Sequence, residues 1–147
     1  MERTLTFFKP DAIDRKIVSE IYEKYIRPNG FNVVSINPVL VTRELILKHY
    51  EENLKNCDED ICNRVVEFYE GKMILVLILE KENAIKDMRK ILGSTDPSKS
   101  AKDTIRGEYG DDCYEVADRE RRSCRNIMHA SDSIEEFERE YSVWFAK

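Results

Sequence analysis

Residues 73–79 read M-I-L-V-L-I-L, seven apolar residues in a row between charged neighbours. The length of this run and its branched residues favour a central β-strand that is buried on both faces. If helices cover one face of such a strand, something else must cover the other face. We therefore expect either a contact with another subunit or a returning segment of the same chain.

Toward the N-terminus, the pattern predicts two further strands with a helix between them. The first strand spans residues 3–9, and the helix begins near Asp14, with apolar residues at helical spacing over 17–26. Pro, Asn and Gly at 28–30 form a strong stop signal. Residues 31–39 then alternate between apolar and polar side chains, which predicts the second strand.

Three more helices are expected around the central run. Thr42 is placed to cap a helix that carries His49 and Tyr50. A shorter helix follows and ends at Gly71. After the central strand, residues 84–92 carry apolar side chains in helical register, which predicts another helix.

The last third of the chain changes character. Residues 93–110 are rich in Gly, Ser, Thr, Asp, Pro and Lys, which predicts a long loop, and long loops are often functional. A charged stretch then leads to a short strand at 124–128, with His129 just past its end. The capping box at 133–136 opens a final helix that runs to about Tyr141.

This order of elements, β-α-β-(α-α)-β-α-loop-β-α, contains the split βαββαβ pattern of ferredoxin-like sheets. We predict an α+β fold, a ferredoxin-like α/β sandwich with a four-stranded antiparallel sheet and helices packed on it. The sequence has 147 residues and shows no internal repeat, so we expect a single domain over 1–147.

The composition limits the partners and the compartment. The net charge of -5 argues against nucleic acid, because binding to a phosphate backbone usually needs a basic face. Neither a signal peptide nor a long apolar segment is visible, so we expect a cytoplasmic protein and no membrane partner. None of the four cysteines forms a C-x-x-C pair, which favours free thiols over a zinc set of His49, Cys57 and Cys62.

His129 is the first candidate for chemistry, because small polar residues follow it at a strand-to-helix connection. Backbone N–H groups at the start of a helix favour anions, so a phosphate could lie beside this imidazole. With an ordinary pKa near ~6.5, the neutral and nucleophilic form of histidine is plentiful at neutral pH. The alternative is a histidine that faces solvent or caps the helix.

Three cationic residues could complete a phosphate site. The T-I-R-G segment at 104–107 brings a hydroxyl, a guanidinium and a flexible glycine together, and a guanidinium matches phosphate oxygens with its planar fork. Lys9 ends an apolar strand directly before Pro-Asp, and Arg89 lies on the helix before the loop. Each could equally be a solvated surface residue, and we interpret the mixed-charge run at 119–125 that way. Together these residues predict a phosphate site.

Four segments resemble the nucleoside diphosphate kinase family: F-F-K-P-D-A at 7–12, H-Y at 49–50, T-I-R-G at 104–107 and N-I-M-H-A-S-D-S at 126–133. They occur in the family's order, and the similarity runs over residues 2–145. The resemblance implies a nucleoside-diphosphate kinase, a phosphotransferase with a ping-pong reaction. A nucleoside triphosphate would donate its γ-phosphoryl group to His129, and a nucleoside diphosphate would then collect it from the phosphohistidine.

The resemblance also implies which residues act. Those implied in catalysis are His129, Lys9, Tyr50, Asn126, Ser131 and Glu140. Those implied in nucleotide binding are Lys9, Arg89, Thr95, Arg106, Asn126 and Ile61. Lys9 and Asn126 would lie at the ribose hydroxyls and the transferred phosphate, and Tyr50 would help to hold Lys9. Ser131 and Glu140 would fix the imidazole, while the sequence leaves open which ring nitrogen attacks.

Mg²⁺ is implied as a cofactor that arrives with the nucleotide and bridges its phosphate oxygens, so no dedicated metal ligands are expected from the protein. Members of the family assemble as hexamers or tetramers built from dimers. The resemblance therefore implies a homo-oligomer, and its contacts would also cover the strand at 73–79.

The chain departs from the family pattern in three places. Residues 57–62 contain no aromatic side chain where members usually carry a phenylalanine for the base, and Ile61 is the candidate substitute. The segment between Gly107 and Asn126 is longer than in common members, which puts extra charged residues beside the nucleotide cleft. Lys and Asp at 102–103 replace the usual Pro-Gly in a segment used for subunit packing, so hexamer, tetramer and dimer stay open.

Two other functions agree with parts of the sequence. A nucleotide-sensing or scaffold paralogue would bind nucleotides without turnover, and the missing aromatic side chain favours it. A ferredoxin-like interaction domain would leave the N-x-x-H motif unexplained. Lys9 and His129 are both present, and binding alone requires no nucleophile, so the enzyme is the preferred interpretation.

Overall fold

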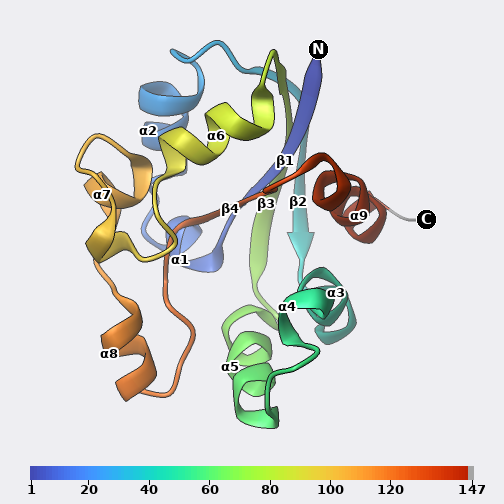
Figure 1. The fold of residues 1–147 in the computed structure, drawn as a ribbon, viewed down its shortest axis with the longest axis vertical. Coiled ribbons are helices and arrows are strands. Elements are labelled where there is room, and N and C mark those ends of the chain that lie inside the picture. The colour runs from blue at the N-terminus through green and yellow to red at the C-terminus, as the bar shows by residue number, and fades with distance from the viewer. Residues whose placement is uncertain (146–147) are drawn as a thin grey trace.

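The structure, a computed structural model, describes residues 1–145 of the chain. Four strands within these residues form one antiparallel sheet in the order β2-β3-β1-β4 (Figure 1). The strands are β1 (Glu2–Phe8), β2 (Asn32–Leu40), β3 (Met73–Lys81) and β4 (Met128–Ala130). This sheet, with helices on both faces, confirms the predicted α+β, ferredoxin-like fold.

β3 is buried on both faces, as its unbroken apolar run predicts. Ile74, Val76 and Ile78 belong to one core cluster, whereas Leu77 and Leu79 belong to the other, because alternate residues of a strand point to opposite faces. Helices of the same chain cover both faces. A returning segment, and not a subunit contact, therefore completes the burial of this strand.

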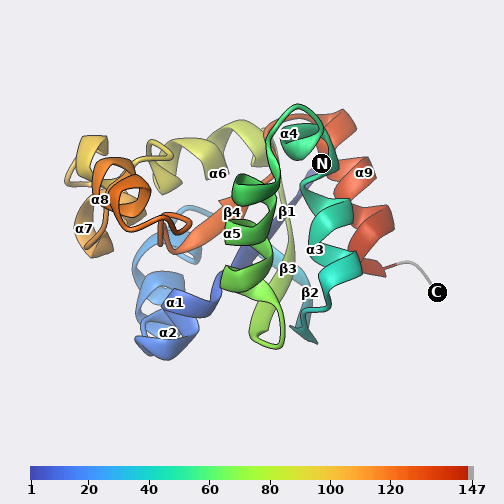
Figure 2. The ribbon, with the colours of Figure 1, turned by 90° about the horizontal axis from the view of Figure 1, so that it is seen from below.

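The helices form a layer on each face of the sheet (Figure 2). One face is covered by α1 (Pro10–Asp14), α2 (Val18–Ile21), the π-helical segment η1 (Tyr22–Ile26), α6 (Ala84–Leu92) and α7 (Ile105–Tyr109). The other is covered by α3 (Arg43–His49), α5 (Glu59–Tyr69) and α9 (Ile134–Phe145). Shorter connections contain α4 (Glu51–Leu54), η2 (Pro97–Lys99) and α8 (Tyr114–Arg119). No helix in the described part of the chain combines the length and the apolar character needed to cross a membrane.

Side-chain caps fix where the helices of the second layer begin. The Thr42 hydroxyl accepts a hydrogen bond from the Leu45 N–H at 3.2 Å, and this confirms the predicted cap of α3. The Ser133 hydroxyl accepts from the Glu136 N–H at 3.0 Å at the start of α9, as the capping box predicts. Both helices carry residues of the site described below.

The prediction of a strand at 124–128 is wrong. The strand is β4, which begins at Met128 and contains His129 at its middle, opposite Phe7 of β1. The reason is Ile127, whose φ of 78° lies in the left-handed region and cannot continue a strand. His129 is therefore held by a strand ladder instead of standing on a loop.

Two other predicted boundaries differ from the structure. The helix expected from Asp14 begins earlier, at Pro10, because proline suits the first helical position, and Lys16 with a φ of 58° then interrupts it. The long loop predicted at 93–110 contains η2 and α7, and α7 is capped by the Thr104 hydroxyl, which accepts from the Gly107 N–H at 3.1 Å. The charged stretch that follows contains α8.

Candidate active site

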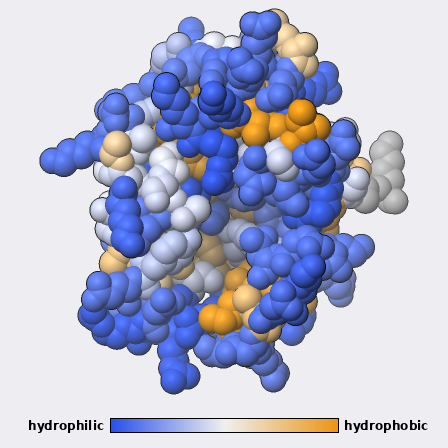
Figure 3. Space-filling view, in the orientation of Figure 1, coloured by the Kyte–Doolittle hydropathy of each residue, from blue (hydrophilic) through white to orange (hydrophobic). Residues whose placement is uncertain are grey.

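A cleft of about 370 Å³ opens between α5 on one side and α8 with the segment after it on the other. Figure 3 shows it as a hollow with hydrophilic residues along most of its rim and apolar residues at its lower edge. The cleft gathers almost all of the residues that the sequence indicated. They are Lys9, Tyr50, Ile61, Arg89, Thr95, Arg106, Asn126, His129 and Glu140. Ser131 is fully buried and is connected to the cleft through Glu140.

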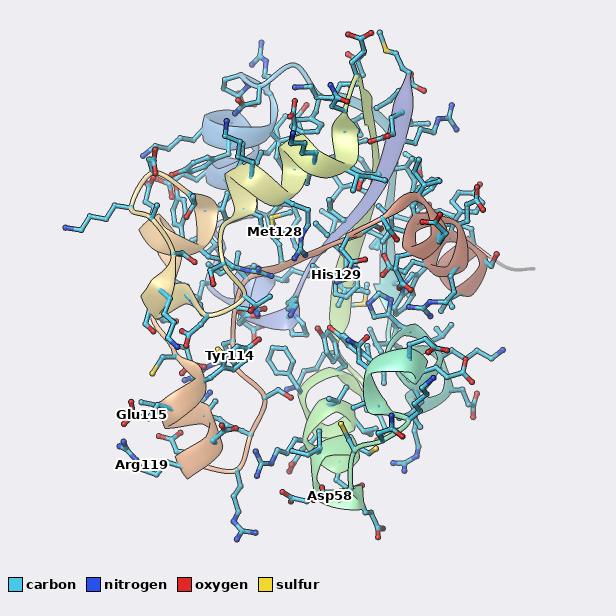
Figure 4. The ribbon with its side chains drawn as sticks, viewed as in Figure 1. Asp58, Tyr114, Glu115, Arg119, Met128 and His129 are labelled. Atoms are coloured by element: carbon cyan, nitrogen blue, oxygen red, sulfur yellow. The ribbon has the colours of Figure 1, made fainter. Side chains whose placement is uncertain are left out.

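The ring of His129 is fixed by its neighbours at the middle of β4 (Figure 4). Its Nε2 atom lies 2.9 Å from Glu140 Oε1, which also accepts a hydrogen bond of 2.6 Å from the Ser131 hydroxyl. Phe7 stacks on the ring with the centroids 5.0 Å apart. Because Nε2 meets a carboxylate, the neutral ring carries its proton on Nε2 and keeps its lone pair on Nδ1.

The surroundings of His129 keep its imidazole neutral. Burial lowers the pKa of His129 well below its usual value. Neighbouring cations lower this pKa further, in the order Lys9, Arg106 and Arg89. Burial also raises the pKa of Glu140, the carboxyl group that contacts Nε2. The ring is therefore in the protonation state that a nucleophile needs.

Lys9 lies at the end of β1 and connects it to the loop before β4. Its ammonium group donates to Asn126 Oδ1 at 2.5 Å, and Asn126 Nδ2 donates to the Thr95 carbonyl at 2.9 Å. Burial lowers the pKa of Lys9 to about 7, with a further contribution from the positive charge of Arg106. A bound anion would favour the protonated amine, so Lys9 is suited to a phosphate ligand.

Arg106 and Arg89 bring positive charge to the cleft without a carboxylate partner. Arg106 is only 3% exposed and donates to the carbonyl oxygens of Asn126 and Met128 at 3.0 and 2.5 Å. Arg89 of α6 donates to the Ala130 carbonyl at 3.2 Å. Over residues 1–145, neither guanidinium has a carboxylate oxygen within 4.0 Å. Two cations held only by neutral carbonyls form a binding site for an anion.

A strained residue sets the position of this loop. The left-handed backbone of Ile127 is unusual for a β-branched residue and has to be held by its surroundings. Its N–H donates to Asp11 Oδ2 at 3.1 Å, and its carbonyl accepts from the Lys9 N–H at 2.8 Å. Asp11 therefore positions the loop between Asn126 and His129. The sequence did not indicate this role, although the residue lies inside the F-F-K-P-D-A segment.

The remaining residues of the predicted set line the second wall of the cleft. The Tyr50 hydroxyl lies 2.9 Å from the hydroxyl of Tyr69, so its hydrogen-bond partner is Tyr69 and not Lys9. Burial raises the pKa of Tyr50 to about 12, which keeps this hydroxyl neutral. Ile61 lies on the first turn of α5 and is half-buried.

His49 is the second histidine of the chain, and it packs directly against His129. The two rings meet edge-on, with centroids 4.5 Å apart. His49 Nδ1 accepts a hydrogen bond of 2.9 Å from the Trp144 indole N–H, and burial lowers the pKa of His49 well below its usual value. The neutral ring must therefore carry its proton on Nε2. His49 supports the His129 ring and has no free lone pair.

This arrangement argues against a resident metal. In the part of the chain that the structure describes, His49, His129 and Glu140 are the one group of possible metal-binding atoms that lie within 4.8 Å of one another. His49 has no lone pair to offer, so this group does not fit a metal ion. The alternative zinc set of His49, Cys57 and Cys62 is not a group whose ligand atoms come together within residues 1–145.

The long segment between the T-I-R-G and N-x-x-H motifs contributes residues that the sequence did not indicate. Tyr114, Asp118 and Arg122 all line the cleft. Arg122 donates to both oxygens of Asp112 at 2.6 and 3.0 Å, so our interpretation of 119–125 as mere solvated surface is wrong for this residue. Only the tertiary structure shows that this segment folds back over the cleft.

Comparison with known proteins agrees with this geometry. The family model described as nucleoside diphosphate kinase matches residues 2–147. A nucleoside diphosphate kinase of Pyrococcus horikoshii is 36% identical over 144 residues, which cover 98% of this chain and 85% of that protein. One from Staphylococcus epidermidis is 37% identical over 145 residues, which cover 99% of this chain and 88% of that protein.

Solved structures show the same similarity. A transition-state mimic of the nucleoside-diphosphate kinase from Borrelia burgdorferi, with bound vanadate and ADP, has a TM-score of 0.91 at 25% identity, over 99% of this chain and 88% of that one. An NDP kinase from Pyrobaculum aerophilum has a TM-score of 0.85 at 30% identity, over 99% and 96% of the two chains. The similarity extends over nearly the whole length in sequence and in structure, and the chain belongs to the nucleoside diphosphate kinase family.

Proposed function

We propose that this protein transfers the γ-phosphoryl group of a nucleoside triphosphate to a nucleoside diphosphate, and that His129 carries the phosphoryl group between them. The observation that supports this most strongly is a neutral imidazole, bound to Glu140 through Nε2, beside the guanidinium groups of Arg89 and Arg106, which have no carboxylate partner among the described residues. Phosphoryl transfer needs alignment and positive charge on the phosphate oxygens more than covalent help. The relative from Borrelia burgdorferi, which holds vanadate and ADP, supports the same reaction.

The reaction has two half-reactions. In the first, the Nδ1 lone pair of His129 bonds to the γ-phosphorus while the bond to the β,γ-bridging oxygen breaks, and the diphosphate leaves with that electron pair. In the second, a terminal oxygen of another nucleoside diphosphate attacks the phosphohistidine, and the electrons of the P–N bond return to Nδ1. Neither step moves a proton at Nδ1, which agrees with a ring whose proton is held on Nε2 by Glu140.

Each half-reaction uses the same phosphate-binding groups. Arg89, Arg106 and Thr95 all line the cleft and would hold the α- and β-phosphates. The two arginines bring positive charge that no carboxylate within residues 1–145 neutralises. Lys9 and Asn126, which are hydrogen-bonded to each other at 2.5 Å, would contact the ribose hydroxyls and the migrating phosphoryl group. Charge that develops on the phosphate oxygens is stabilised by groups that are already in place.

The residues around the ring act on its orientation. Glu140 contacts Nε2, and Ser131 donates a hydrogen bond to the same Glu140 oxygen, so together they set the tautomer. Tyr50 would present its hydroxyl, held by Tyr69, to the γ-phosphoryl region, and Ile61 would contact the base.

Mg²⁺ would bind with the nucleotide and not to a protein cage. Three of the four carboxylates that line the cleft are engaged: Asp118 with Arg64, Glu136 with Arg139, and Glu140 with His129. Asp132 is the fourth, and one carboxylate alone does not make a cage for the ion. This donor set agrees with an ion that is coordinated mainly by phosphate oxygens and water. When it is bound, Mg²⁺ supplies charge neutralisation on those oxygens.

We further propose a homo-oligomer built from dimers, a hexamer or a tetramer. β2 is an edge strand, and it exposes Val34, Ile36 and Leu40 with 43%, 57% and 60% of their surface accessible. An apolar hollow of about 440 Å³ lies at the same side of the sheet, between α1, α2 and the start of β3. An exposed apolar edge strand of this kind can pair with strands of other molecules and cause aggregation, and a specific subunit contact would prevent this.

The four free thiols favour a reducing compartment, and we propose a cytoplasmic location on that ground.

We also propose that residues 1–147 fold as one domain. Its support is the shared sheet, because both helical layers pack on the same strands.

The test uses ATP labelled at the γ-phosphate. The wild-type protein should acquire label that is lost in acid and stable in base, as expected for a phosphohistidine, and should pass the label to added diphosphate. His129→Ala should acquire none. Label that persists in this variant would place the nucleophile elsewhere, and wild-type protein that binds ATP but takes no label would contradict the proposed function.

A further inference from the structure

Tyr114 is an exposed aromatic residue at the edge of the cleft. It is the first residue of α8, and 42% of its surface is accessible. Figure 4 shows it at the end of α8 nearest to the centre of the molecule, whereas Glu115 and Arg119 lie on the outer side of the same helix. Over residues 1–145 no aromatic ring pairs with it, although most of the other large rings are paired.

The wall of the cleft opposite Tyr114 is apolar. Ile61, Val65 and Phe68 of α5 all line it. They are spaced at i, i+4 and i+7, so they form one stripe along the helix. None of the three is fully exposed or fully buried. A flat, apolar group could therefore lie between this stripe and the Tyr114 ring, at the open side of the phosphate-binding residues.

The segment that carries Tyr114 is held in place. Asp112, whose side chain is 1% exposed, accepts two hydrogen bonds from the Arg122 guanidinium and one of 2.8 Å from the Arg125 N–H. Arg64 of α5 contacts Asp118 of α8 at 3.3 Å and so ties the two walls together. Tyr114 is thus presented by an anchored helix, and little ordering is needed when a ligand binds.

We propose that Tyr114 stacks on the nucleobase of the substrate and takes the place of the aromatic residue that is missing from 57–62. The inference rests on the proposed function. A nucleotide whose phosphates are bound by Arg89 and Arg106 would have its base at the open side of the cleft, next to Tyr114. Base–aromatic stacking tolerates any base, since every base has a π-face. A tyrosine at this position therefore strengthens nucleotide binding without selecting among bases, as a general nucleoside diphosphate kinase requires.

The test measures ADP binding by calorimetry for the wild type, Tyr114→Ala, Tyr114→Phe and Tyr141→Ala. Tyr141 of α9 is 44% exposed and lies outside the cleft, so it is a matched control for loss of an exposed tyrosine. Loss of a stacking ring should weaken ADP binding roughly 5- to 150-fold in Tyr114→Ala. Tyr114→Phe keeps the ring and should bind as the wild type does, and so should Tyr141→Ala.

A second measurement separates stacking from a structural effect. Inorganic tripolyphosphate has no base, so the rate at which it phosphorylates the protein should be equal in the wild type and in Tyr114→Ala, while kcat/KM for ATP falls. An equal loss for ATP and tripolyphosphate would overturn the proposal, as would unchanged ADP binding in Tyr114→Ala. Failure of the proposed function would look different: ADP binding would still depend on Tyr114, but the wild type would transfer no phosphoryl group.

Discussion

The reactivity of His129 is decided by contacts that no short motif contains. Glu140 lies on α9, eleven residues along the chain, and its 2.9 Å contact leaves Nδ1 as the free nitrogen. Phe7 and His49 then hold the ring from two sides. The motif predicts that this histidine is reactive, but the choice of nitrogen depends on helix packing and cannot be inferred from the sequence.

Lys9 should make nucleotide binding depend on pH. Its pKa is lowered to about 7 in the free protein, and bound phosphates favour the charged amine, so binding takes up a proton above that pH. The affinity for ADP should therefore fall as the pH rises from 7 to 9, by at most about tenfold per pH unit. In Lys9→Arg this dependence should disappear, because a guanidinium stays charged. Calorimetry over this pH range tests the prediction, and an equal pH dependence in both proteins would contradict it.

His49 should be replaceable by a residue that accepts a hydrogen bond. In His49→Gln the amide oxygen can accept from the Trp144 indole N–H, so most phosphotransfer should remain. His49→Leu leaves that buried donor unpaired and should lower the free energy of unfolding by about 1–3 kcal/mol relative to His49→Gln. Urea unfolding and labelled-ATP assays measure the two effects. A loss of activity in His49→Gln as deep as in His129→Ala would show that the roles of the two histidines are assigned wrongly.

At the level of elements, the long helices and strands were predictable, while the connections were not. β3, α3, α5 and α6 follow from periodicity and caps, because those signals are local. β4 was misplaced because Ile127 turns the chain, and that turn depends on a hydrogen bond to Asp11, far away in the sequence. The fold of residues 108–125 also depends on contacts with distant parts of the chain. The position of Tyr114 at the cleft therefore could not be inferred from the sequence.

The anchoring of α8 gives a prediction at this level. Asp112→Asn removes the charge that Arg122 and the Arg125 N–H contact, and it should lower the free energy of unfolding by about 2 kcal/mol. Burial alone would raise the pKa of Asp112, but these hydrogen bonds lower it, so the stabilisation is present above the ordinary aspartate pKa and is lost at more acidic pH.

The matched control for this variant is Glu115→Gln, on the exposed face of the same helix. Glu115→Gln should leave both stability and ADP binding unchanged. Asp112→Asn should weaken ADP binding as well as stability, because loss of the anchor displaces α8 and the Tyr114 side chain that it carries. Urea unfolding at pH 7 and at pH 3, which is below the ordinary aspartate pKa, measures the stability difference, and this difference should shrink at the lower pH. Equal behaviour of the two variants would show that Asp112 does not anchor the segment.

At the level of the whole molecule, helices of one chain cover both faces of the sheet, and of its two edge strands β2 is the long one with exposed apolar side chains. Ile36→Lys should therefore break the proposed dimer contact, because a charge in an apolar interface is costly. Ile134→Lys changes an isoleucine of similar exposure on α9 and is the control. Light scattering after size exclusion should show a smaller assembly for Ile36→Lys alone. Equal masses for both variants and the wild type would place the interface elsewhere.

The most direct test of the central claim is to identify the phosphorylated atom. Protein labelled with ¹⁵N at histidine, phosphorylated by ATP and examined by ³¹P and ¹⁵N NMR, should show one phosphoramidate at Nδ1 of His129, because Nε2 is held by Glu140. A phosphate on Nε2, or on His49, would contradict the mechanism derived from this geometry.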